Sequence, residues 1–206
     1  MKRIEVGSQK PNFIGCWDID NKNLCNEIVS FFEGNKDLSK VGTTTLGKNI
    51  KAKKTTDITI TPKDLEKPKF EIFKKYFNEL HKCYVDYQQQ WPFVKSVFSS
   101  VDIGVFNIQK YNPGDHFSHL HCERTSLNSL HRLFAFMTYL NDVEEGGKTN
   151  FNYYGIQVKP EKGKTLIWPA EWTHAHTGEV LKSGTKYIVT GWMHFPTSDE
   201  EIKQKK

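Results

Sequence analysis

Three side chains in the C-terminal half of the chain have the types and spacing of metal ligands. His121 and Glu123 lie two residues apart, and His176 follows later in the sequence. On an extended strand, side chains at i and i+2 project from the same face, so His121 and Glu123 can converge on one point. Two imidazoles and one carboxylate form the facial triad that holds non-haem Fe(II) and leaves coordination positions open. The three residues are therefore candidates for metal ligands and for catalytic residues.

Two further histidines compete for this role. His119 lies two residues before His121, and His174 lies two residues before His176. Each pair would share one face of a strand. A lone His-x-Glu pair is usually a solvated surface pair, and spacing alone leaves His119 and His174 open as ligands.

The order of the motifs around these residues helps to decide which histidines are the ligands. They are Tyr111-Asn-Pro-Gly114, His121-x-Glu123, Tyr139-Leu-Asn141, Gly146-Gly-Lys-Thr149-x-Phe151, Pro160-x-x-Gly163, His176 and Gly184-x-Lys186. In this order they resemble the 2-oxoglutarate- and Fe(II)-dependent dioxygenases of the prolyl 4-hydroxylase type. The chain also looks like small hydroxylase-like proteins of phages that infect marine bacteria. The family register favours His121 and His176 as ligands and places His119 and His174 at the rim.

The resemblance also implies which residues bind the 2-oxoglutarate cosubstrate. Lys186 would pair with its distal carboxylate. This fits the strand-like run 185–192, in which an inward-facing ammonium is costly unless it is paired. Tyr111, Thr138 and Tyr139 would offer hydroxyl groups. Because side chains alternate along a strand, only one of Thr138 and Tyr139 can face inward.

Arg132 and Trp192 are the residues predicted to contact the substrate. Arg132 lies in the apolar run 130–140, where a structural ion pair is an equal alternative. The chain departs from the family at Glu123, where an aspartate is usual. Glutamate is one methylene longer and can still reach a metal. The position of its carboxylate and its tendency to bind through both oxygens are less constrained than those of aspartate. A carboxylate at this position favours hydroxylation over halogenation, because similar halogenases lack it.

Composition describes an ordinary globular protein. The 206 residues are 37% hydrophobic and 13% aromatic, which is enough to bury a substantial core. No apolar run approaches the roughly 18 residues of a membrane span, and no signal peptide is apparent. The four cysteines show no C-x-x-C spacing, so free thiols in the cytoplasm are expected, in the host cytoplasm if the chain is phage-encoded. The net charge of +5, with basic runs at 48–54 and 203–206, leaves a nucleic-acid partner as the less favoured option.

The elements that position the site are predicted from periodicity. Residues 20–33 form an N-capped amphipathic helix ended by Gly34, and a second helical stretch begins at Thr61 and reaches Gln90. Five short β-branched and aromatic runs follow, at 104–111, 133–140, 155–158, 165–168 and 187–194. The fold class is α+β, and the resemblance narrows it to a double-stranded β-helix of the jelly-roll type. One domain is expected, with a helical flank (1–93), a catalytic core (94–196) and a charged tail (197–206).

The predicted function is the hydroxylation of a protein or peptide, most simply at proline. Fe(II), 2-oxoglutarate and O2 are implied by the resemblance, with ascorbate as a supporting reductant. The alternatives are the same chemistry on another side chain, a free amino acid or a nucleobase. A nucleic-acid demethylase of this fold would be expected to hold its cosubstrate with Arg rather than Lys. A non-catalytic jelly-roll module that retains metal is the third alternative.

Overall fold

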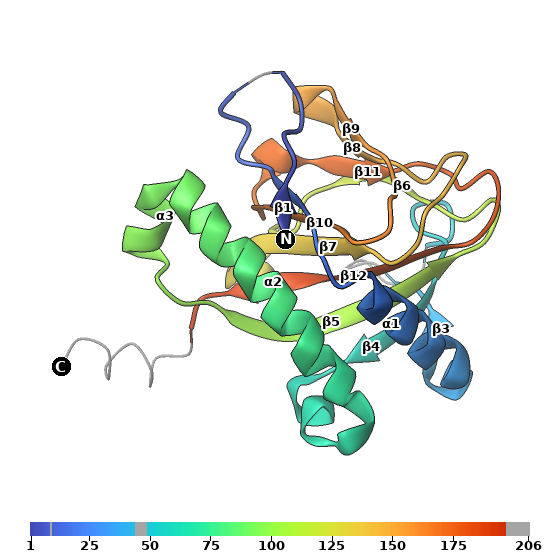
Figure 1. The fold of residues 1–206 in the computed structure, drawn as a ribbon. Coiled ribbons are helices and arrows are strands. Elements are labelled where there is room, and N and C mark those ends of the chain that lie inside the picture. Colours follow the sequence, from blue (N-terminus) through green and yellow to red (C-terminus); the bar gives the residue numbers. More distant parts are fainter. Residues whose placement is uncertain (9, 44–48, 197–206) are drawn as a thin grey trace.

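Two antiparallel sheets form the core of the protein (Figure 1). The computed structural model describes residues 1–8, 10–43 and 49–196. The large sheet has eight strands in the order β1 (Lys2–Arg3), β2 (Gly15–Asp18), β10 (Lys164–Pro169), β7 (Arg132–Tyr139), β12 (Lys186–His194), β5 (Asp102–Tyr111), β4 (Thr56–Ile60) and β3 (Lys40–Val41). The small sheet has four strands in the order β6 (Phe117–His121), β11 (His176–Gly178), β8 (Thr149–Phe151) and β9 (Ile156–Val158). The predicted α+β class, with helices beside antiparallel sheets, is confirmed.

Within the described residues, three α-helices and several short 3-10 turns complete the fold. Helix α1 (Lys22–Gly34) begins where the Asn21 side chain accepts a hydrogen bond from the Leu24 N–H, one turn into the helix. Helix α2 (Glu71–Gln90) is the longest, and α3 (Pro92–Val97) follows it directly. The 3-10 turns are η1 (Lys36–Leu38), η2 (Pro62–Glu66), η3 (Pro68–Phe70), η4 (Leu127–Ser129), η5 (Asn152–Tyr154) and η6 (Trp172–His174). No helix in the described ranges is both long and apolar enough to cross a membrane.

The second helix begins later than predicted. Residues 61–70 form the turns η2 and η3, and the α-helix starts at Glu71. Lys67, between the two turns, has the extended backbone angles φ −86° and ψ 137°. Proline disfavours the α conformation in the residue before it, so Pro68 interrupts the helical run at Lys67.

Alternation along β7 divides the core into two layers. Phe134 and Phe136 pack with the cluster that includes α1 and α2, whereas Ala135, Met137 and Tyr139 belong to a second cluster with strands of the small sheet. The helices therefore lie on one face of the large sheet and the small sheet on the other (Figure 1). Both faces of β7 are buried, which explains why its sequence is an apolar run rather than an alternating one.

Residues 1–93 contribute strands to the large sheet as well as helices. Strand β2 pairs with β10, and β4 pairs with β5. The flank predicted for this region contained helices alone, because runs as short as Gly15–Asp18 and Thr56–Ile60 carry too few residues to show a period. The predicted charged tail, 197–206, lies outside the described residues.

Candidate active site

His121 and His176 are brought together by the pairing of two short strands. They are Cα partners in the antiparallel pair β6–β11, and their ring centroids are 4.3 Å apart. The Nδ1 atom of His121 lies 2.8 Å from the His119 carbonyl oxygen, and that of His176 lies 2.9 Å from the His174 carbonyl oxygen. A carbonyl oxygen only accepts, so each Nδ1 donates its hydrogen. Each Nε2 therefore keeps a lone pair for another partner.

Glu123 completes a cluster of three possible ligands. Its Oε1 atom lies 3.4 Å from the Nε2 atom of His176 and 3.8 Å from the Nε2 atom of His121. The three ligand atoms lie within 4.8 Å of one another. The cluster contains the three residues predicted from the sequence, and the donor set fits a divalent metal that takes nitrogen and oxygen ligands.

The protonation of the cluster suits a metal. Burial and the neighbouring His176 lower the pKa of His121 to about 4, although the Glu123 carboxylate acts in the opposite direction. Burial raises the pKa of Glu123, but the neighbouring imidazoles of His176 and His121 outweigh this and bring the pKa to about 2. At neutral pH the site thus presents a neutral imidazole at His121 and an ionised carboxylate. Metal ligands must be deprotonated in this way before they bind.

Aromatic side chains hold the two imidazoles in place. The Phe117 ring stacks on His121 at 3.8 Å between centroids with an interplanar angle of 12°. Trp168 and Phe151 lie against His176 at 5.1 Å and 5.6 Å between centroids. Phe151 and Trp168 are buried. These rings form an apolar wall that the sequence analysis did not assign to the site.

The other two histidines lie outside the cluster. His174 is buried, and its ring nitrogens contact the Asn12 carbonyl oxygen at 2.9 Å and the Thr173 hydroxyl at 3.0 Å. His119 is exposed. Neither imidazole is among the three grouped possible ligands, which favours His121 and His176 over His119 and His174.

Lys186 lies at the start of β12, next to Tyr111 on β5. The two residues are Cα partners, and the Lys186 Nζ atom is 4.0 Å from the centroid of the Tyr111 ring. Lys186 is only 3% exposed, and its ammonium donates to the Gly147 carbonyl oxygen at 2.9 Å. Burial lowers its pKa to about 7, and Glu179 acts in the opposite direction. A cation so deeply buried is costly unless an anion joins it.

Tyr139 and Thr138 lie on opposite faces of β7. The Tyr139 hydroxyl shares a hydrogen bond of 2.6 Å with Thr149, on the side of the small sheet. The Thr138 hydroxyl lies 2.9 Å from the Tyr76 hydroxyl of α2 and 2.8 Å from that of Thr165. Thr138 therefore faces the helices, and the prediction that it contacts the cosubstrate is wrong. Alternation places only one of the two on the side of the small sheet, and that residue is Tyr139.

Arg132 and Trp192 both contact Glu123. The Trp192 Nε1–H group donates to Glu123 Oε2 at 2.6 Å. Arg132 Nη1 donates to the Glu123 carbonyl oxygen at 2.9 Å, and the Arg132 guanidinium lies 3.6 Å from the centroid of the Trp192 ring. The two residues thus adjoin the ligand cluster, as substrate contacts would, while also holding one of its members.

A buried polar chain that the sequence analysis missed leads away from Tyr111. The Tyr111 hydroxyl donates to Gln109 Oε1 at 2.7 Å, and Gln109 Nε2 donates to Asp57 at 3.2 Å. Asp57 forms an ion pair of 2.7 Å with Lys53. All four side chains are buried. The one signal in the sequence was Gln109, a polar residue two positions before Tyr111 on the same face of an apolar strand.

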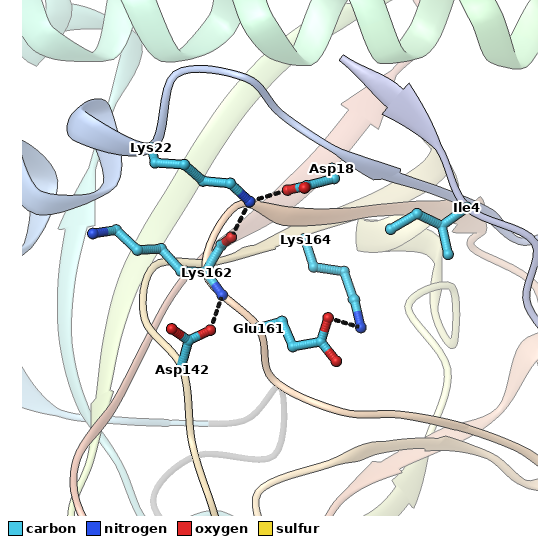
Figure 2. A pocket seen from close by; sticks show the side chains of 7 residues that line it. All are labelled: Ile4, Asp18, Lys22, Asp142, Glu161, Lys162 and Lys164. Atoms are coloured by element: carbon cyan, nitrogen blue, oxygen red, sulfur yellow. Dashed lines mark hydrogen bonds and ion pairs between the residues drawn. The ribbon is translucent and has the colours of Figure 1, made fainter.

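A separate polar hollow lies on the surface and is lined by Ile4, Asp18, Lys22, Asp142, Glu161, Lys162 and Lys164 (Figure 2). Four of its six charged side chains form ion pairs within the hollow. Lys22 pairs with Asp18, and Lys164 pairs with Glu161 at 2.9 Å. The hollow contains none of the three grouped ligands, so it is not part of the candidate active site.

Comparisons with known proteins relate part of the chain to a family of oxygenases. Residues 106–194, which span β5 to β12, match the sequence model of the 2OG-Fe(II) oxygenase superfamily. The chain is 28% identical over 92 residues to prolyl 4-hydroxylase subunit alpha-2 of Gallus gallus, a match that covers 41% of this chain and 17% of that protein. The chain spans less than half the length of the first curated relatives that it matches.

Solved structures share the fold over most of the chain. The viral collagen prolyl hydroxylase of Paramecium Bursaria Chlorella virus-1, solved with 2-oxoglutarate, has a TM-score of 0.64 and 17% identity, covering 92% of this chain and 100% of that one. A prolyl hydroxylase of Trichoplax adhaerens, in complex with a peptide fragment of the hypoxia inducible factor oxygen degradation domain, has a TM-score of 0.69 and 12% identity, covering 95% and 88%. The predicted resemblance is thus confirmed: through residues 106–194 the chain is related to the 2OG-Fe(II) oxygenase superfamily, and it is prolyl 4-hydroxylase-like.

Proposed function

We propose that the chain is an Fe(II)- and 2-oxoglutarate-dependent dioxygenase that hydroxylates a prolyl residue of a protein or peptide. The observation that carries the proposal is the convergence of the His121 and His176 Nε2 atoms with the Glu123 carboxylate. Two imidazoles and a carboxylate are the donor set that suits non-haem Fe(II) in oxygenases. These three residues would hold the metal from one side and leave its other positions to the cosubstrate and O2.

Iron and 2-oxoglutarate, once bound, would supply the oxidising chemistry of the reaction together with O2. The protein's task is to position and shield them. The Lys186 ammonium would pair with the distal carboxylate of 2-oxoglutarate. This anion would offset the cost of burying the Lys186 charge. The Tyr111 and Tyr139 hydroxyls lie on the same side of the large sheet and would assist. Phe117, Phe151 and Trp168 would exclude water from the imidazoles.

The substrate would approach from the side of Arg132 and Trp192. Both are partly exposed, and both adjoin Glu123. A protein or peptide substrate is supported by the Trichoplax adhaerens relative in fold, which was solved with a peptide fragment. Proline is supported by the prolyl 4-hydroxylases to which the sequence is similar.

We infer that the two sheets make up a double-stranded β-helix in one domain, with its catalytic core in residues 94–196. A cytoplasmic location, within an infected host cell if a phage encodes the chain, is also proposed. We also propose a viral origin, in line with the fold shared with a viral enzyme.

Mass spectrometry of peptides tests the proposal. The protein is incubated with Fe(II), 2-oxoglutarate, ascorbate and a panel of proline-containing peptides, and products are searched for the gain of one oxygen atom. We expect the gain on proline, and its loss in His121→Ala but not in the matched rim variant His119→Ala. A gain on another side chain or on a nucleobase would change the substrate class. Metal binding without any succinate formation would indicate a non-catalytic module.

A further inference from the structure

The carboxylate of Glu123 presents its two oxygen atoms to different neighbours. Oε1 faces the two imidazoles, at 3.4 Å from His176 and 3.8 Å from His121. Oε2 accepts the indole N–H of Trp192 at 2.6 Å. A hydrogen bond this short to an ionised acceptor belongs to the strong, charge-assisted class. One oxygen is thus available to a metal, and the other is already engaged.

We propose that Trp192 is a positioning residue that restricts Glu123 to metal binding through a single oxygen. The inference rests on the proposed function and deepens it. A carboxylate can bind a metal through one or both oxygens. If Oε2 also bound, it would occupy a coordination position that the cosubstrate or O2 requires. The Trp192 N–H holds Oε2 away and so keeps that position open.

The length of the side chain explains why such a restraint matters here. Glutamate has one more rotatable bond than aspartate, so its carboxylate can swing through more orientations. Replacing Glu123 by aspartate would also draw the carboxylate back by about 1.5 Å, the length of one carbon–carbon bond. If one aspartate oxygen remained near the two imidazoles, the other would therefore lie farther from the Trp192 N–H than Oε2 does now. The length of the Glu123 side chain and its hydrogen bond to Trp192 therefore depend on each other.

Arg132 holds the indole and the Glu123 main chain together. Its guanidinium lies 3.6 Å from the Trp192 ring centroid, and its Nη1 atom donates to the Glu123 carbonyl oxygen at 2.9 Å. Arg132 Nη1 is 3.9 Å from Oε2, which adds positive charge on the same side. The Glu123 N–H donates to the Ala170 carbonyl oxygen at 3.2 Å. The residue is thus fixed at its backbone and at one carboxylate oxygen.

Binding measurements with Trp192→Phe test the inference without turnover. Co(II) replaces Fe(II), its absorption spectrum reports the coordination number, and 2-oxoglutarate is titrated into the Co(II) protein. We expect Co(II) affinity alone to be unchanged or tighter, and the affinity for 2-oxoglutarate to fall about tenfold or more, because a hydrogen bond to a charged group is lost. In a Glu123→Asp background the same substitution should have a much smaller effect, which a double-mutant cycle measures. Trp172→Phe, which removes an exposed indole, is the matched control.

The outcomes separate this inference from the proposed function. If Trp192→Phe binds 2-oxoglutarate as the native protein does and loses only peptide affinity, Trp192 is a substrate contact and the inference fails. If the native protein binds neither Co(II) nor 2-oxoglutarate, the proposed function itself fails.

A second measurement uses the native chain and does not depend on the folding of a variant. The Trp192 indole N–H is followed by hydrogen exchange in NMR spectra of the Zn(II) complex. We expect it to stay protected when the metal binds. Loss of protection on Zn(II) binding would mean that Oε2 has moved to the metal, and would overturn the inference.

Discussion

His121 and His176 face each other as cross-strand partners of β6 and β11, with ring centroids 4.3 Å apart. Residues far apart in the sequence thus become neighbours through one ladder of a four-stranded sheet. Each ring donates its Nδ1–H to the carbonyl oxygen two residues earlier, so the strand backbone also sets the direction of each Nε2 atom. Metal binding and the β6–β11 pairing are therefore expected to be coupled.

Removing either histidine should abolish metal binding. His121→Ala or His176→Ala takes away one of only three grouped ligands, so Co(II) binding measured by calorimetry should be lost. His119→Ala should bind Co(II) like the native protein, because His119 is exposed and outside the cluster. Equal losses in His119→Ala and His121→Ala would show that the ligand set is wrong.

Truncation of Lys186 should weaken the cosubstrate and spare the metal. Lys186→Met keeps most of the apolar stem but removes the ammonium, which would leave a carboxylate of 2-oxoglutarate buried without its partner. Loss of one member of such a pair costs about 2–5 kcal/mol, so the affinity for 2-oxoglutarate should fall at least about tenfold. Co(II) affinity without cosubstrate should stay the same. The exposed Lys182→Met is the control, and equal 2-oxoglutarate affinity in both variants would remove Lys186 from the site.

Binding of 2-oxoglutarate should take up a proton at alkaline pH. Burial holds the pKa of Lys186 at about 7 in the free protein, against an ordinary value near 10.4 for lysine. The ammonium form is needed for a carboxylate, so above pH 7 binding must protonate Lys186, and affinity should fall as the pH rises. Calorimetry in buffers of different ionisation enthalpy measures the uptake. Its persistence in Lys186→Met would assign the proton to another group.

The lowered pKa of Lys186 also determines how the free energy of unfolding changes with pH. Between about pH 7 and about pH 10 the unfolded chain holds a proton on Lys186 that the folded chain has lost. The unfolded state binds more protons in this window, so the contribution of Lys186 to the free energy of unfolding rises with pH. Comparison of urea denaturation of the native protein and Lys186→Met across this window should show the difference.

The buried Lys53–Asp57 ion pair should matter more for stability than an exposed one. Asp57→Ala leaves the Lys53 ammonium buried without its 2.7 Å partner, and breaking such a pair costs about 3–5 kcal/mol. The double variant Lys53→Met/Asp57→Leu should be less destabilised than Asp57→Ala. Glu71→Ala, which breaks the exposed Lys74–Glu71 pair, should change little. Urea denaturation measures all three, and a mild effect of Asp57→Ala would show that water reaches Lys53.

The long strands could be predicted from sequence, and so could the three residues that the fold groups as possible ligands, but most of the short strands and the walls of the site could not. The apolar runs at 133–140 and 187–194 correspond to β7 and β12. Strand β6 was not predicted because its three central residues are all exposed, so no buried face alternates along it. Strands β8 and β11 have only three residues each. No period is visible in segments of this kind.

The choice between Thr138 and Tyr139 shows a second limit of sequence reasoning. Alternation requires that one of them face the site, but it does not say which face of β7 the helices cover. Only the contact of Thr138 with Tyr76 on α2 decides this. The stacking of Phe117 on His121 and the Trp192–Glu123 hydrogen bond likewise join segments whose approach depends on the completed fold.

We expect this site to couple 2-oxoglutarate turnover to the hydroxylation of proline. This expectation is tested most directly by reacting the protein, Fe(II), 2-oxoglutarate and a peptide substrate under heavy-isotope O2, followed by mass spectrometry of both products. The account predicts one labelled oxygen atom in succinate and one in hydroxyproline, in equal amounts, and neither product in Glu123→Ala. Label in succinate without any hydroxylated peptide, or a hydroxyl oxygen drawn entirely from water, would contradict it.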